Sequence, residues 1–166
     1  MEHYRRNIAI DVTVEGQTLT SVSRMTDEYH DLELHLTLNL NGYFITACEG
    51  RMHKHPYQVC PGALEALKLV VGMHVSPGVK KEYRRTVPKA VGCAHFTEVF
   101  ENTFDFLLQK LYWDGAGREI ADREGHEKMI FGILNQSDTC FAFNKNTGFL
   151  PEPSEFLPAH PAERKK

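Results

Sequence analysis

Five side chains that can transfer protons or hold anions are concentrated between residues 30 and 55 of this chain. They are His30, Glu49, Arg51, His53 and His55. A histidine titrates near neutral pH, so it can take or give a proton. A glutamate can orient an imidazole, and an arginine can bind a carboxylate or a phenolate. These residue types indicate acid–base chemistry on a small anionic molecule.

A predicted β-hairpin must bring these side chains together. Every second residue from Leu32 to Leu40 is leucine, which is typical of a strand with one buried face. Asn41-Gly42 follows and is a preferred two-residue hairpin turn. The second strand then runs from Tyr43 to about His53.

A two-residue turn fixes the register of this hairpin. The predicted pairs are Leu40 with Tyr43, Leu38 with Ile45, Leu36 with Ala47, Leu34 with Glu49, Leu32 with Arg51 and His30 with His53. The leucine face would therefore become polar at its open end, with the side chains of His30, Glu49, Arg51 and His53 pointing inward. The alternative is a solvated hairpin end whose charges protect the edge of the sheet.

A second candidate cluster combines thiols with an imidazole. It consists of Cys60, Cys93, His95 and Cys140. Three thiolates and one imidazole are a natural zinc set, although these residues come from distant segments. Cysteines are also frequent in protein cores. A reactive thiol is the third alternative, because Cys60 and Cys93 both lie at predicted helix N-termini.

Four further residues could contact a substrate. Tyr57 and Tyr83 could donate to a phenolate or enolate oxygen, Cys60 could line the site, and Phe96 could wall an apolar pocket. Each has a structural alternative, since tyrosines often lie at the edge of a core and Phe96 belongs to an apolar helix stripe.

The remaining elements predict an α+β fold in which an antiparallel sheet is packed on one face by one long helix and one or two shorter helices. Strands are expected at 7–14, 17–25 and 139–143, with a polar strand at 79–87. Helices are expected from Cys60 to about Gly72, from Cys93 to about Tyr112, and at 126–134. The long helix carries Phe96, Val99, Phe100, Thr103, Phe104 and Leu107 at helical spacing.

Length and composition indicate one α+β domain, residues 1–150, followed by a proline-rich tail, residues 151–166, that is expected to be disordered. A net charge of −3 argues against nucleic-acid binding. No apolar run has the length of a membrane span, and the N-terminus does not read as a signal peptide. We therefore expect a cytoplasmic protein with reduced thiols.

Four segments follow a recognisable pattern. They are Tyr29-His30-Asp31, Pro56-Tyr57-x-x-Cys60, Gly92-Cys93-Ala94-His95-Phe96-Thr97-Glu98 and, more weakly, Asp138-Thr139-Cys140-Phe141-Ala142. Together, over residues 5–150, they resemble the bacterial domain of unknown function 2889 family. The chain departs from the family pattern at Ala94, Phe96 and Phe141. The resemblance implies one domain, roles for His30, Cys60, Cys93 and His95, and an association with catabolism of aromatic or lipid-like acids.

These observations favour a small enzyme that acts on a hydrophobic, aromatic molecule, of anionic or phenolic character, by histidine-based acid–base chemistry. A lyase or isomerase type fits best, because the chain has no P-loop, dinucleotide-binding glycine motif or nucleophile elbow. No cofactor is needed for proton transfer, and a homodimer is expected. His30 or His53 would be the base, and the site would lie where the hairpin's open end meets the helix starting near Cys93. The alternatives are a ligand-binding or assembly module without turnover and a zinc-stabilised structural domain.

Overall fold

The computed structural model describes the backbone of residues 2–119 and the side chains of residues 2–111. The chain divides into two compact units, Met1–Gln109 and Lys110–Lys166, and the account below concerns the first. The predicted helix at 126–134, the predicted strand at 139–143, Cys140 and the proline-rich tail lie outside the described residues. Within the described part of the chain, no helix has the length and apolar character needed to span a membrane.

Four antiparallel strands form one sheet in the order in which they occur along the chain. The strands are β1 (Asn7–Glu15), β2 (Thr18–Thr26), β3 (Asp31–Asn39) and β4 (Phe44–Lys54). Among the described residues, each strand pairs only with its neighbours in sequence, as expected for a meander of hairpins. The turn at Gly16 lies between β1 and β2, where the sequence predicts it, and Gly16 has a φ of 58°.

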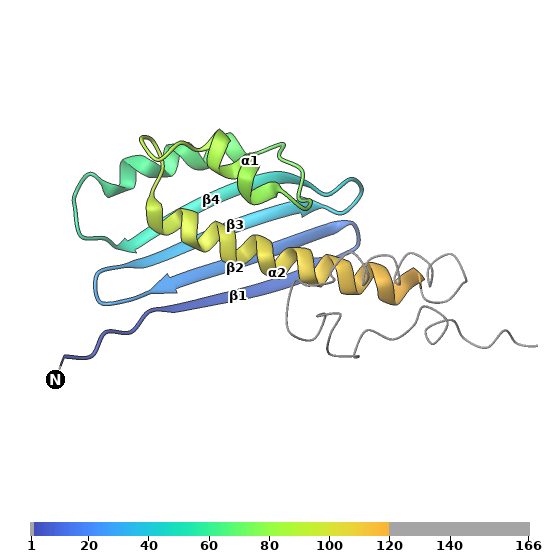
Figure 1. Ribbon diagram of the computed structural model, residues 1–166, viewed down its shortest axis with the longest axis horizontal. Helices are drawn as coiled ribbons and strands as arrows, with labels where there is room; N and C mark the ends of the chain where they lie inside the picture. Colours follow the sequence, from blue (N-terminus) through green and yellow to red (C-terminus); the bar gives the residue numbers. More distant parts are fainter. Residues whose placement is uncertain (1, 120–166) are drawn as a thin grey trace, which may run out of the picture. The chain divides into compact units, whose positions relative to one another are not determined.

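The helices pack on one face of this sheet (Figure 1). They are the 3₁₀ helix η1 (Cys60–Val70), α1 (Val79–Thr86) and the long α2 (Ala94–Glu119). In the described part of the chain, one four-stranded antiparallel sheet with one long and two shorter helices confirms the predicted α+β class.

The segment at residues 79–87 is a helix, so the predicted strand there is wrong. Val79, Tyr83 and Val87 are all buried, and their spacing of four follows the helical rather than the strand period. The helix begins after Gly78, whose φ of 106° is a conformation that glycine adopts easily. The charged residues of this segment therefore occupy the outer side of a short amphipathic helix.

The core forms between the inner face of the sheet and the apolar stripe of α2. The fully buried sheet residues include Leu19, Met25, Leu32, Leu34, Leu36, Leu38 and Ile45, and the buried α2 residues are Phe96, Val99, Phe100, Thr103, Phe104 and Leu107. The ring of Tyr83 lies 4.5 Å from that of Phe100, which brings α1 into the same core.

Three hydroxyl groups lie inside this otherwise apolar core. Ser21, Ser23 and Thr103 are fully buried. The Ser23 Oγ and Thr103 Oγ1 atoms are 2.7 Å apart, and Ser21 Oγ is 3.5 Å from Ser23 Oγ. Because Thr103 Oγ1 donates to the carbonyl of Val99, it accepts from Ser23. The hydroxyls thus satisfy one another and link β2 to α2.

The register of the β3–β4 hairpin agrees with the prediction only near the turn. Leu38 pairs with Ile45 as predicted, but Thr37 pairs with Ala47, so one residue of β4 is inserted at Thr46. Such a β-bulge moves every later side chain to the opposite face. The strand pairing also stops at Asn39 and Phe44, which leaves a four-residue loop instead of the predicted two-residue turn.

Beyond the bulge, small and apolar residues face the core and polar residues face outward. The inner pairs are Leu36 with Cys48, Leu34 with Gly50 and Leu32 with Met52. Glu49 instead pairs with His35 and Arg51 with Glu33, on the outer face. A second register shift, between Asp31 and Leu32, leaves His53 exposed and unpaired with His30. The predicted polar end of the inner face, made of Glu49, Arg51 and His53, is therefore wrong.

Side chains of two helices approach β4 closely at Gly50. A Cβ atom added there would overlap Leu67 Cδ1 and would lie 2.9 Å from Leu64 Cδ2 and 3.0 Å from Phe96 Cζ. These atoms belong to side chains of η1 and α2, which would have to shift to make room. Gly50→Ala should lower the free energy of unfolding by about 1–3 kcal/mol, as overpacking usually does. Urea denaturation measures this loss, with Gly62→Ala as the control because no atom lies near its added Cβ. Equal stability of the two variants would contradict the close approach at Gly50.

The aromatic stripe of α2 supports a second stability prediction. Phe100 is fully buried against the sheet and Tyr83, whereas Phe106 is 39% exposed on the same helix. Phe100→Ala should lower the free energy of unfolding by about 3–5 kcal/mol, the usual range for a buried phenylalanine. Phe106→Ala should lose clearly less. An unchanged denaturation midpoint for Phe100→Ala would mean that the stripe does not form the core.

Candidate functional site

Two histidines meet at the beginning of α2. The ring centroids of His30 and His95 are 3.8 Å apart, and the ring planes are inclined by 39°. His30 lies in the loop between β2 and β3 and is only 7% exposed, while His95 is half-buried in the first turn of α2. The predicted inward orientation of His30 and its proximity to His95 are confirmed.

The loop that carries His30 is organised by Asp27. The Asp27 N–H donates to the carbonyl of His30, which closes the turn. Asp27 Oδ1 in return accepts the backbone N–H groups of Tyr29, at 2.8 Å, and His30, at 2.7 Å. The same oxygen lies 2.9 Å from His30 Nδ1. An aspartate at the start of a turn often binds the backbone in this way, and here it also positions the imidazole.

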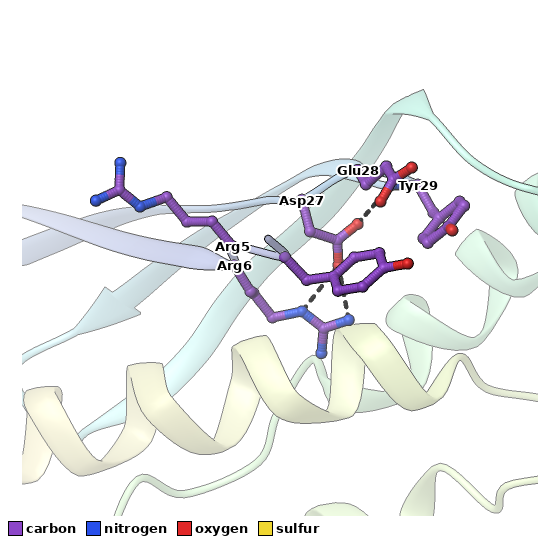
Figure 2. A pocket seen from close by; sticks show the side chains of 6 residues that line it. Arg5, Arg6, Asp27, Glu28 and Tyr29 are labelled. Carbon is purple, nitrogen blue, oxygen red and sulfur yellow. Dashed lines mark hydrogen bonds and ion pairs between the residues drawn. The ribbon is translucent and has the colours of Figure 1, made fainter. Parts of the chain in front are cut away.

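Arg6 connects this loop to the first strand and to α2. Its guanidinium donates to Asp27 Oδ2 through Nε, at 2.8 Å, and to Glu98 Oε2 through a terminal nitrogen, at 2.6 Å. Figure 2 shows the guanidinium of Arg6 turned toward the Asp27 carboxylate above the ribbon of α2. The array of Arg6, Asp27, His30, His95 and Glu98 therefore joins three parts of the fold, and we refer to it as the histidine-pair site.

Hydrogen bonding keeps Asp27 ionised. Burial would raise the pKa of this carboxyl, but the hydrogen bonds from the Tyr29 N–H, the Arg6 guanidinium and His30 outweigh burial and hold the pKa well below its usual range. An ionised carboxylate only accepts hydrogen bonds, so Nδ1 of His30 must carry the proton that it shares with Asp27. In a neutral His30 ring, Nε2 is then the basic nitrogen.

His95 is held in an environment that opposes its protonation. Burial lowers the pKa of His95, and the neighbouring His30 ring and the Arg6 guanidinium lower it further, against the opposing effect of Asp27 and Glu98. Its Nδ1 also lies 3.9 Å from Cys93 Sγ. A neutral imidazole at neutral pH can act as a base.

An open hollow adjoins the histidine-pair site (Figure 2). Its volume is about 310 Å³, and it is lined by Tyr4, Arg5, Arg6, Asp27, Glu28 and Tyr29. Arg6 and Asp27 belong both to this hollow and to the histidine-pair site. Tyr4 and Tyr29 are 64% and 53% exposed, so aromatic surface is available there for a bound molecule.

The structure brings together only some of the residues singled out by the sequence. His30, Cys93 and His95 lie at one place, whereas Glu49, Arg51 and His53 lie on the outer face or edge of the hairpin. The shared site predicted for His53 with the other histidines is therefore wrong. The cause is the inserted residue at Thr46, which the regular alternation of the leucines does not reveal.

The other predicted contacts of a substrate are distributed over the core and the surface. Tyr83 and Phe96 are buried in the core, where burial raises the pKa of Tyr83 to about 12. Tyr57 is exposed, and its carbonyl lies 2.8 Å from His55 Nδ1. Cys60 begins η1 and is half-buried.

The predicted zinc set is not assembled in the described part of the chain. Among residues 2–111, no group of three or more His, Cys, Asp or Glu side chains is arranged to hold a metal ion. Cys60 has no hydrogen bond to Cys93 or His95 among these residues, and Cys140 lies outside them. The described residues thus supply no support for a zinc-stabilised domain.

Sequence reasoning missed two residues of the histidine-pair site, Arg6 and Asp27. Arg6 shares the inward parity of Ile8 and Ile10 in the following strand. Asp27 stands at the start of the turn before His30, a position where aspartate commonly caps backbone N–H groups. Both features are visible in the sequence, but neither shows that Arg6 and Asp27 bind each other in the folded chain.

The lowered pKa of His95 predicts how stability should change with pH. Between that lowered pKa and the ordinary value of 6.5, the unfolded chain binds more protons at this residue than the folded chain does. The contribution of His95 to the free energy of unfolding should therefore fall as pH decreases from about 7.5 to 5.5. Melting temperatures across this range should fall less for His95→Gln than for the wild type. His53→Gln tests whether any surface histidine has the same effect, and a slope unchanged by His95→Gln would contradict the prediction.

Comparison with known proteins places the chain in a family. No curated protein and no solved structure is significantly similar to it. Residues 5–109 match the family described as protein of unknown function, DUF2889. The match ends at Gln109, the last residue of the first compact unit, and it includes every residue of the histidine-pair site. Since the match covers more than half of the sequence, the chain belongs to the DUF2889 family.

Proposed function

We propose that this protein is an acid–base enzyme that acts on a small aromatic acid, by a reaction of the lyase or isomerase type. The observation that supports the proposal is the array of an ionised carboxylate and two imidazoles at Asp27, His30 and His95. Proton transfer of this kind requires only positioned side chains with suitable protonation states, so the proposal includes no cofactor.

The two histidines would have different roles. Asp27 fixes the tautomer and orientation of His30, which is almost fully buried. His95 is half-buried, and its lowered pKa favours the neutral ring that a general base needs at neutral pH. His95 would therefore take the proton from the substrate, and His30 would position and polarise its neighbour.

The hollow beside the histidine-pair site suggests the class of substrate. The rings of Tyr4 and Tyr29 could contact an aromatic ring, whereas the Arg5 guanidinium points away from Asp27 and Tyr29 (Figure 2). Arginine binds carboxylates readily. An aromatic carboxylate that occupies the hollow would lie next to Arg6 and Asp27, which are shared with the histidine-pair site.

A cytoplasmic location is part of the proposal. The described cysteines Cys48, Cys60 and Cys93 are free thiols, as is usual in a reducing compartment.

One observation favours a second candidate, a ligand-binding module without turnover. His30 is only 7% exposed, and neither histidine belongs to the lining of the hollow. A ligand could therefore occupy the hollow without reaching an imidazole. In that case the Asp27–His30 contact would serve only to hold the loop.

Deuterium exchange distinguishes the two candidates. Phenylpyruvate is a suitable probe, because it is an aromatic acid with an enolisable C–H bond whose exchange in D₂O is followed by proton NMR. The wild-type protein should accelerate exchange at that carbon, and His95→Gln should reduce the acceleration by about 10²–10⁴, the usual contribution of a general base. Binding of phenylpyruvate, measured by ligand-observed NMR, should persist in the variant.

Two comparisons complete this experiment. His53→Gln removes an exposed histidine outside the site and should leave exchange unchanged. Binding without any acceleration by the wild type would exclude the acid–base proposal for this substrate class and favour the binding module. Absence of both binding and exchange would contradict the assignment of the hollow to an aromatic acid.

A further inference from the structure

The two edges of the sheet differ in how they are protected. At the β4 edge, the segment 72–75 covers the beginning of the strand through three backbone hydrogen bonds. They are Ile45 N–H to Met73 O, Gly72 N–H to Ile45 O and Val75 N–H to Tyr43 O. β4 also contains two register shifts, which distort an edge and hinder pairing with another strand.

The β1 edge has none of these features. All nine residues of β1 pair with β2 in an unbroken register, and no described residue makes a backbone hydrogen bond along the opposite side of the strand. The strand contains neither proline nor lysine, which natural proteins often place on exposed edges. Within the described chain, β1 therefore offers a regular template for another strand.

The inner face of β1 also remains incompletely covered. Ile8, Ile10, Val12 and Val14 are only half-buried, whereas the inward leucines of β3 are 0–1% exposed. An additional strand beside β1 would cover this apolar row, and burial of apolar surface favours association.

Alternate residues of β1 point their backbone N–H and C=O groups away from β2. Glu15 and Thr18 flank a two-residue turn, so they form a hydrogen-bonded pair and the odd-numbered residues of β1 face β2. The N–H and C=O groups of the even-numbered residues, with Ile10 at the middle, therefore point toward the free edge.

We infer that a second copy of this chain pairs with β1 in antiparallel register, centred on Ile10, to give a continuous eight-stranded sheet in a homodimer. A two-fold axis at Ile10 places Arg5 opposite Glu15 of the partner subunit, and this pair occurs twice. It also places Asp11 opposite Ala9 of the partner subunit. Opposite charges directly across an antiparallel pair are favourable.

The registers centred on Asp11 and on Val12 lack this complementarity. Centring the pair on Asp11 would bring two Asp11 side chains together, which is unfavourable for like charges. Centring it on Val12 would place Glu15 opposite Ala9 of the partner subunit, with no compensating cation. A pair centred on Ile8 would also bring Arg5 opposite Asp11 of the partner subunit, but it would align only residues 7–9 of β1 with each other. Charge and strand length together therefore favour the register centred on Ile10.

This pairing would also affect the hollow described above. Arg5 and Tyr4 line the hollow, and the register places the partner subunit's Glu15 and the turn after it beside them. The partner would thereby complete one wall of the hollow. The inference concerns the sheet edge and holds whether or not the proposed acid–base chemistry does.

Charge reversal on the full-length chain tests the register. Sedimentation velocity should show a dimer for the wild type. Arg5→Glu and Glu15→Arg should each raise the dimer dissociation constant by on the order of tenfold or more, because each change acts twice in a symmetric dimer. The double variant R5E/E15R should restore dimerisation, since the reversed charges again face each other.

Two substitutions of opposite charge at Ala9 test this register specifically. Ala9 is exposed on the outer face and faces Asp11 of the partner subunit, so Ala9→Asp should weaken the dimer and Ala9→Lys should strengthen it. Circular dichroism melts verify that the variants are folded. A monomeric wild type would overturn the inference, as would a dimer that is insensitive to all of these changes.

Discussion

The arrangement of the candidate site depends on one carboxylate, that of Asp27. Its two oxygens receive hydrogen bonds from the backbone of its own loop, from the His30 imidazole and from Arg6. Arg6 extends the same network to Glu98 on α2. The β2–β3 loop, the residue before β1 and the first turns of α2 are thus connected through a single ionised group, and the contact between His30 and His95 is built on that connection.

Much of the fold follows from two patterns in the sequence. The alternating leucines identify β3, and the phenylalanines spaced by four residues identify α2, so the two halves of the core can be predicted. The bulge in β4 could not be predicted from the hairpin turn alone. The parity of the inward residues nevertheless changes from odd, at Ile45, to even, at Cys48, Gly50 and Met52. That change of parity is the local trace of the inserted residue.

The candidate site is predictable only in part, for a related reason. Position along the chain placed His30 on the inner side and His95 at a helix start, and these two residues do meet. Arg6 and Asp27 are separated by 21 residues in sequence, and their ion pair arises only when β1 and β2 are paired along their whole length. Local patterns describe elements well, but a hydrogen-bonded network among several elements depends on their exact register.

The buried hydroxyl groups have a consequence for the site at the start of α2, about two turns before Thr103. Phe96, Phe100 and Phe104 repeat at every turn, so an apolar stripe of this kind could slide along the sheet by one turn, about 5.4 Å, and still bury similar surface. The hydrogen bond between Ser23 and Thr103 favours one of these positions, because a slip of four residues would place the apolar side chain of Val99 or Leu107 against the buried Ser23 hydroxyl. A slip of one turn would bring Val99 to the place of His95 beside His30. The hydrogen bond between Ser23 and Thr103 therefore helps to fix the position of α2 along the sheet, and with it the position of His95 beside His30.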